Sequence, residues 1–135
     1  MVWNVNVWAV LVSAVAYFAV GALWYGALFG KPWMEALGRT REEIAQGGGA
    51  SISYLWTFLL EVVTCFVLAV LVLNSPVTGL LGGAGLGLLV ALGIWGTLLA
   101  ITFLYEGRKT SLYLIDLGYH VVGLVVAGAI VGAWA

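Results

Sequence analysis

The sequence predicts an all-α membrane protein that crosses the bilayer four times as one domain. Apolar residues occupy 64% of the 135 positions and charged residues only 8%, whereas soluble domains carry about 25% charged residues. A soluble domain of this size could not bury so much apolar surface. Four long runs with almost no charge divide the chain, and each is long enough to span the hydrocarbon.

These runs are expected to form the transmembrane helices, at 5–29, 52–73, 79–105 and 112–134. About 20 helical residues cross about 30 Å of hydrocarbon. Lone strands would leave amide groups unpaired in lipid, and the runs lack the alternation of a barrel. The whole of 1–135 is therefore one transmembrane domain, and 30–51 is its largest connection.

The connections predict how the helices are joined. Asn74 to Thr78 and Glu106 to Thr110 are short, so the spans on either side of each should be antiparallel neighbours. In the long connection, Thr40-Arg41-Glu42-Glu43 has the pattern of a capping box, and Gly47-Gly48-Gly49 would end the short helix that it begins. Pro32-Trp33 predicts a turn along the interface, with Trp33 at headgroup depth.

The cationic residues predict the orientation. All five lie in the first and third connections, namely Lys31, Arg39, Arg41, Arg108 and Lys109. Because cytoplasmic loops are enriched in Lys and Arg, these connections should face the cytoplasm and both termini the opposite side.

Other features narrow the function classes. The net charge of −1 provides no basic field for nucleic acid. The lone Cys65 excludes an internal disulfide. We find no nucleophile–base pair, phosphate loop or cofactor motif, so we expect no cofactor and regard enzymatic activity as uncertain.

Three ionisable residues lie within the predicted spans: Glu61, Asp116 and His120. Glu61 and His120 each lie seven residues into a span from a tyrosine, at about 10 Å from the inner interface. Asp116 precedes His120 by four residues and shares its helix face. Buried charges cost about 2.5–3.5 kcal/mol at the centre of a span, so these three residues should face the protein interior.

Three interpretations of this polar trio stay open. It could hold helices together by hydrogen bonds. It could bind a proton or cation, because histidine changes charge near neutral pH. It could also ligate a metal ion through Glu61, Asp116 and His120.

Further residues complete the candidate site. Thr57 and Cys65 share the helix face of Glu61, whereas Thr97 and Thr102 should bond to their own helix. The proposed binding or proton site comprises Glu61, Asp116, His120, Tyr119, Thr57 and Tyr113. The proposed interface or gate, partly an aromatic belt, comprises Trp24, Tyr25, Lys31, Trp33, Glu106 and Arg108.

Small residues and a weak repeat predict packing. Gly79, Gly83 and Gly87 form a stripe that allows close helix approach, either within the subunit or, as we slightly favour, in a homodimer. The two halves of the chain share Tyr-Leu followed by a Val-Val pair at equal spacing, which makes Glu61 equivalent to His120 in a parallel repeat.

Two segments carry a resemblance to a known family. The stretch 21–34, GALWYGALFGKPWM, and the stretch from Glu106 to Ile130 resemble the domain of unknown function 1761 family. That family comprises small, mainly bacterial, four-span membrane proteins. Its members often have proline at the position of Ala27. The resemblance implies the same topology and draws attention to the residues Trp24, Lys31, Glu106, Arg108, Asp116, Tyr119 and His120.

The leading hypothesis is a small membrane protein that moves a solute or ion in a proton-linked reaction. We expect it in the plasma (bacterial inner) membrane, as a homodimer in the lipid bilayer, with a small-molecule or ion ligand. The alternatives are an accessory or structural membrane protein whose trio only packs helices, and a membrane metal-binding protein.

Overall fold

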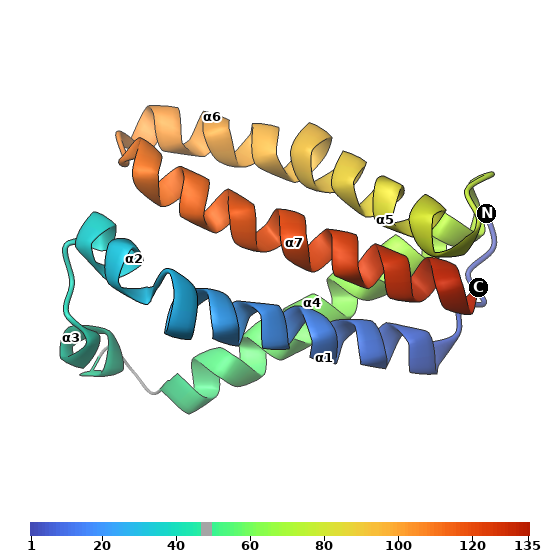
Figure 1. Ribbon diagram of the computed structural model, residues 1–135, viewed down its shortest axis with the longest axis horizontal. Helices are drawn as coiled ribbons and strands as arrows, with labels where there is room; N and C mark the ends of the chain where they lie inside the picture. Colours follow the sequence, from blue (N-terminus) through green and yellow to red (C-terminus); the bar gives the residue numbers. More distant parts are fainter. Residues whose placement is uncertain (47–49) are drawn as a thin grey trace.

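A computed structural model describes residues 1–46 and 50–135 of the chain (Figure 1). Every regular element in these described ranges is a helix. In chain order they are α1 (Val7–Leu23), η1 (Trp24–Leu28), α2 (Gly30–Leu37), α3 (Arg41–Gln46), α4 (Ala50–Leu73), α5 (Gly79–Val90), η2 (Ala91–Gly96), α6 (Thr97–Glu106) and α7 (Thr110–Trp134). The segments η1 and η2 are π-helical.

Four of the resulting helices are long and apolar enough to cross a membrane, which confirms the predicted all-α, four-span fold. They cover Val7–Leu28, Ser51–Leu73, Gly79–Glu106 and Thr110–Trp134. The first span therefore continues from α1 into η1, and the third runs through α5, η2 and α6 without a break.

The two ends of the bundle carry different elements (Figure 1). One, which we call the α2 end, carries α2, α3 and the turn between α6 and α7. The other, the terminal end, carries both chain termini and the turn between α4 and α5. There the Asn74 side chain accepts a hydrogen bond from the Val2 amide and donates one to the Val2 carbonyl, each at 2.7 Å, and so ties the N-terminus to this turn.

Helix α7 lies at the centre and packs most closely against α5. Glycines on both helices permit this approach: a Cβ at Gly83 would lie only 1.9 Å from the Gly128 carbonyl oxygen, and one at Gly87 would lie 2.1 Å from the Leu124 carbonyl oxygen. Gly83 and Gly87 of the stripe therefore pack within the subunit. Our preference for it as a dimer contact was wrong, because the neighbouring backbone of α7 already occupies that face.

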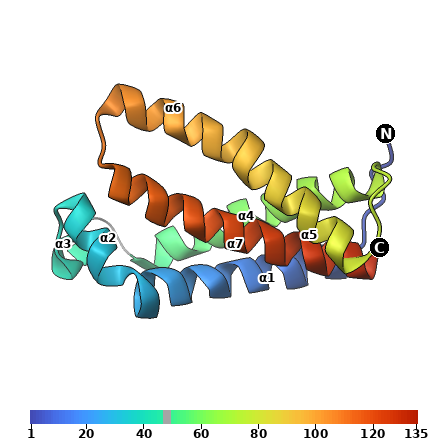
Figure 2. The same ribbon diagram turned by 45° about the horizontal axis from the view of Figure 1, so that its top comes forward.

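Helix α4 crosses behind α1 and packs against α1 and α7 (Figure 1). It meets α5 at few points, so the expectation that the second and third spans are antiparallel neighbours was wrong: α5 packs against α7 instead. A short turn brings two helix ends together, but packing sets the angle between the helices. Figure 2 shows that α6 and α7 diverge toward the turn that connects them.

The long connection contains two short helices. Pro32 and Trp33 lie inside α2, not in the predicted interfacial turn. Proline is tolerated there because the first amides of a helix have no partner within it. The Thr40 hydroxyl accepts a hydrogen bond from the Glu43 amide at 3.2 Å, as a capping threonine does. The predicted stop at Gly47-Gly48-Gly49 lies outside the described residues.

The core lies where α1, α4 and α7 meet. Its largest fully buried side chains are Tyr17, Leu68, Cys65 and Ser13. Many large apolar residues remain exposed on all four spans. This pattern suits a protein whose outer surface contacts lipid.

Candidate functional site

The polar side chains within the spans gather around the half of α7 that is nearer the α2 end. Asp116, Tyr119 and His120 lie within about one turn of this helix. Each forms a hydrogen bond with a different side chain from another helix. Glu61 reaches this region from α4, and Tyr17 and Tyr25 reach it from the first span. These polar groups therefore come from three of the four spans.

Two π-helical segments flank this part of α7. From η1, the Trp24 indole N–H donates to the Ile115 carbonyl at 2.9 Å. In η2, the Gly96 carbonyl accepts from the Tyr113 hydroxyl, also at 2.9 Å. Segments of π-helix are rare and frequently mark functional sites. Their placement on both sides of α7 singles out this region of the bundle.

Each member of the polar trio is hydrogen-bonded to a tyrosine. The pairs are Glu61 with Tyr119, Asp116 with Tyr25, and His120 with Tyr17. The Tyr25 hydroxyl donates to Asp116 Oδ1 at 2.6 Å. All three pairs join different helices, because Tyr17 and Tyr25 belong to the first span and Glu61 to α4.

Glu61 has the least favourable environment of the three. Its side chain is almost completely buried, with 6% of the residue exposed. Oε1 accepts the hydrogen bond from Tyr119, but Oε2 is buried and has no partner among the described residues. An unpaired buried polar group costs about 1–3 kcal/mol, and more when it is charged. The Glu61 carboxyl therefore lacks one of the contacts that its ionised form requires.

Aromatic rings connect the three pairs. The Tyr119 ring lies 5.4 Å from the ring centroids of both Tyr17 and Tyr25, with near-perpendicular planes. The His120 ring lies 4.0 Å from the Trp95 ring of η2. Within the described part of the chain, no hydrogen bond links one member of the trio directly to another, so the trio is connected through tyrosines.

Glycines make room for these rings. A Cβ at Gly123 would lie 2.6 Å from the Tyr17 ring, and one at Gly118 would lie 2.6 Å from the Trp24 ring. Gly21 on α1 similarly lies against Tyr119. The small residues of α7 therefore position the aromatic side chains of the first span.

The arrangement does not assemble a metal site. Among the residues that the structure describes, no group of three or more His, Cys, Asp or Glu side chains could hold a metal ion. The metal interpretation of Glu61, Asp116 and His120 thus finds no preformed ligand set.

Comparison with known proteins identifies the family. A model of the family described as protein of unknown function DUF1761 matches residues 8–132. The chain belongs to this family. The match includes nearly all of the four spans and confirms the resemblance that the sequence motifs indicated. No curated protein and no solved structure matches the chain.

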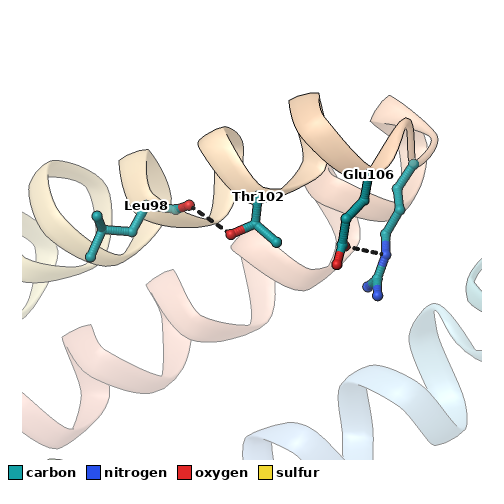
Figure 3. A network of polar contacts seen from close by, with 4 residues as sticks. Leu98, Thr102 and Glu106 are labelled. Atoms are coloured by element: carbon teal, nitrogen blue, oxygen red, sulfur yellow. Dashed lines mark hydrogen bonds and ion pairs between the residues drawn. The ribbon is translucent and has the colours of Figure 1, made fainter.

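The other polar side chains of the spans in this DUF1761 protein bond to their own helices or lie in the core. Thr57, a predicted binding residue, is exposed and donates to the Ser53 carbonyl of its own helix at 2.7 Å. Cys65 is fully buried in the core. Thr97 and Thr102 bond to carbonyls of their own helix, as predicted, and Figure 3 shows Thr102 with Leu98.

The predicted interface residues divide into two groups. Trp24 and Tyr25 take part in the site through the hydrogen bonds described above, and Trp33 of α2 packs on Tyr25 with centroids 4.9 Å apart. Lys31 is exposed. Glu106, the last residue of α6, and Arg108 form an exposed ion pair at 2.9 Å (Figure 3). Such pairs contribute little to stability.

Sequence reasoning did not select Tyr17 or Trp95 for the site. Tyr17 is 2% exposed and belongs to the core, although it is a polar aromatic residue far from the ends of its span. The position of a polar aromatic residue so deep in a span was the sequence feature that could have indicated Tyr17 as a site residue. No sequence feature indicated that Trp95 would face His120, because its orientation depends on the π-helical register of η2.

Proposed function

We propose that this protein moves a small solute or ion across the membrane in a proton-linked reaction, with Glu61 as the proton-binding group. The observation that carries the proposal is the buried carboxyl with one unpartnered oxygen. A buried carboxylate is unfavourable without a compensating cation, so this group should be occupied by a proton or by a positive ligand. Alternation between these two occupants is the basis of proton-linked exchange.

The surroundings of Glu61 support a role in proton transfer. Two titratable groups face Glu61 from other helices, namely the hydroxyls of Tyr119 on α7 and Tyr17 on α1. A tyrosine hydroxyl can both donate and accept a hydrogen bond. Cys65 lies one turn along α4 from it. Tyr17 in turn bonds to His120, and imidazole commonly relays protons near neutral pH. Small rotations of these side chains would form a path from Glu61 to His120.

We further propose that the α2 end faces the cytoplasm, which leaves both termini on the opposite side. All five Lys and Arg lie in the connections at this end. Because four helices rarely enclose a pathway alone, assembly as a homodimer in the plasma membrane is part of the proposal. The exposed apolar surfaces of α4 and α6 are available for such assembly.

An accessory role in which the polar residues only join helices is the competing function. The pairs Tyr25–Asp116 and Tyr17–His120 favour it, because each joins the first span to α7 with its hydrogen-bonding groups matched. Interhelical hydrogen bonds of this kind contribute about 0.6 kcal/mol on average. The unpartnered oxygen of Glu61 is what a purely structural role leaves unexplained.

Proton flux into vesicles tests the proposal. Full-length protein is reconstituted into liposomes that contain a pH-sensitive dye together with sodium, potassium and benzyltrimethylammonium chloride as counter-solutes, and the external pH is lowered. We expect faster acidification than in protein-free vesicles, and loss of this activity in Glu61→Gln and in His120→Ala. Glu35→Gln, at an exposed acid of α2 outside every proposed site, is the matched control and should retain the flux. If Glu61→Gln conducts as the wild type does, the accessory role replaces the proposal.

A further inference from the structure

We infer that the positive ligand of Glu61 is an organic ammonium cation. This inference rests on the proposed function, since it names the solute that would exchange with the proton. Two observations carry it: the charge balance within the spans and the kind of groups around Glu61.

The charge balance selects a cation. Glu61 and Asp116 are the acidic residues within the candidate site, and every Lys and Arg of the chain lies outside the four spans. No fixed cation is therefore available inside the membrane to neutralise Glu61. An anionic solute would meet two carboxyl groups and no positive partner, which is unfavourable in a low-dielectric interior.

The surrounding groups favour an organic cation over a metal ion. Hard metal cations need several oxygen ligands, usually six or more for Mg²⁺ and Ca²⁺. Glu61 offers one free oxygen, and the described residues contain no group of three metal-ligating side chains. Instead, the Tyr119 ring, whose hydroxyl bonds to Glu61, lies against the rings of Tyr17 and Tyr25. Aromatic faces bind ammonium groups through cation–π attraction, which strengthens when the site excludes water.

The exchange is balanced in charge. When the ammonium cation arrives, the Glu61 carboxyl releases its proton to water, and the resulting carboxylate pairs with the cation. When the cation leaves, the carboxylate takes a proton back. The site is neutral in both states, so neither state leaves an uncompensated charge in the membrane.

Equilibrium dialysis with radiolabelled benzyltrimethylammonium tests the inference on full-length protein in detergent, with protein-free micelles as the blank. We expect saturable binding that releases protons into weakly buffered solution. Glu61→Gln should weaken binding by roughly 30-fold or more, because a buried charge loses its partner. Glu35→Gln, at an exposed acid of α2 outside every proposed site, should bind as the wild type does. Neopentylbenzene, the neutral isostere with carbon in place of nitrogen, should not compete.

Equal competition by neopentylbenzene would overturn the inference, and that comparison uses only wild-type protein. Absence of saturable binding, or unchanged binding in folded Glu61→Gln, would also overturn it. If Glu61→Gln does not fold, Glu61→Asp keeps the charge on a shorter side chain and should still bind the cation in preference to the isostere. Glu61-dependent proton flux without ammonium binding would refute the ligand and leave the proposed function standing. Ammonium binding without such flux would refute the proposed function.

Discussion

The Tyr119 hydroxyl on α7 donates its hydrogen bond to one carboxyl oxygen of Glu61 on α4, while the second oxygen is buried without a partner. This contact joins two spans that cross at an angle in the centre of the bundle (Figure 1). Only one of the two carboxyl oxygens of Glu61 therefore has a hydrogen-bond partner among the described residues. The same side chain is thus both a link between helices and a buried carboxyl with one unpaired oxygen.

Replacing Tyr119 with phenylalanine should leave both oxygens of Glu61 unpaired. We expect a loss of about 1–3 kcal/mol in the free energy of unfolding, the usual effect of an unsatisfied buried polar group. Tyr105→Phe is the control, because Tyr105 is 90% exposed, and it should leave stability unchanged. Unfolding in mixed micelles measures both variants. Equal stability of the two variants would show that the Tyr119 hydroxyl does not satisfy Glu61.

Gly83 and Gly85 provide a matched test of the packing between α5 and α7. A Cβ at Gly83 would lie 1.9 Å from the Gly128 carbonyl, whereas one at Gly85 would meet nothing within 4 Å. Gly83→Ala should therefore lower stability by about 1–3 kcal/mol. Gly85→Ala should be neutral or slightly stabilising, because alanine favours helix more than glycine does. Thermal unfolding would distinguish them, and a Gly83→Ala variant that is folded but monomeric would instead indicate a dimer contact.

Gly123 should control the contact between Tyr17 and His120. A Cβ at this position would lie 2.6 Å from the Tyr17 ring, so Gly123→Ala should displace the ring and lengthen its hydrogen bond to His120 Nδ1. Nitrogen NMR of the single histidine measures this change directly. Gly26→Ala, where a Cβ meets nothing within 4 Å, should leave the spectrum unaltered. Identical spectra for both variants would contradict the observed packing of Tyr17.

The orientation can be tested with single cysteines in a Cys65→Ala background. The distribution of Lys and Arg predicts that Asn4→Cys is labelled by a membrane-impermeant thiol reagent in intact cells. Lys109→Cys should be labelled only after the membrane is made permeable. Labelling of Lys109→Cys from outside would reverse the orientation and place the α2 end outside the cytoplasm.

The sequence by itself determined the four-span helical fold. In lipid every amide must be paired, which only helices and closed barrels achieve. The long uncharged runs lack the alternation of barrel strands, so they form helices. Glu61, Asp116 and His120 were also evident from sequence, since ionisable residues within spans are rare. The capping threonine of α3 was recognisable because capping depends on neighbours along the chain.

Only the tertiary structure decided which groups meet. The pairing of each ionisable residue with a tyrosine depends on how α1, α4 and α7 cross, and crossing angles come from side-chain packing. The glycine stripe has the same spacing whether it faces α7 or a second subunit, so its partner could not be read from spacing. Trp95 faces His120 through the register of η2, and a π-helical turn shifts every later side chain relative to the α-helical pattern. Local periodicity therefore defines the helices of this protein, whereas contacts between helices far apart in the sequence define its site.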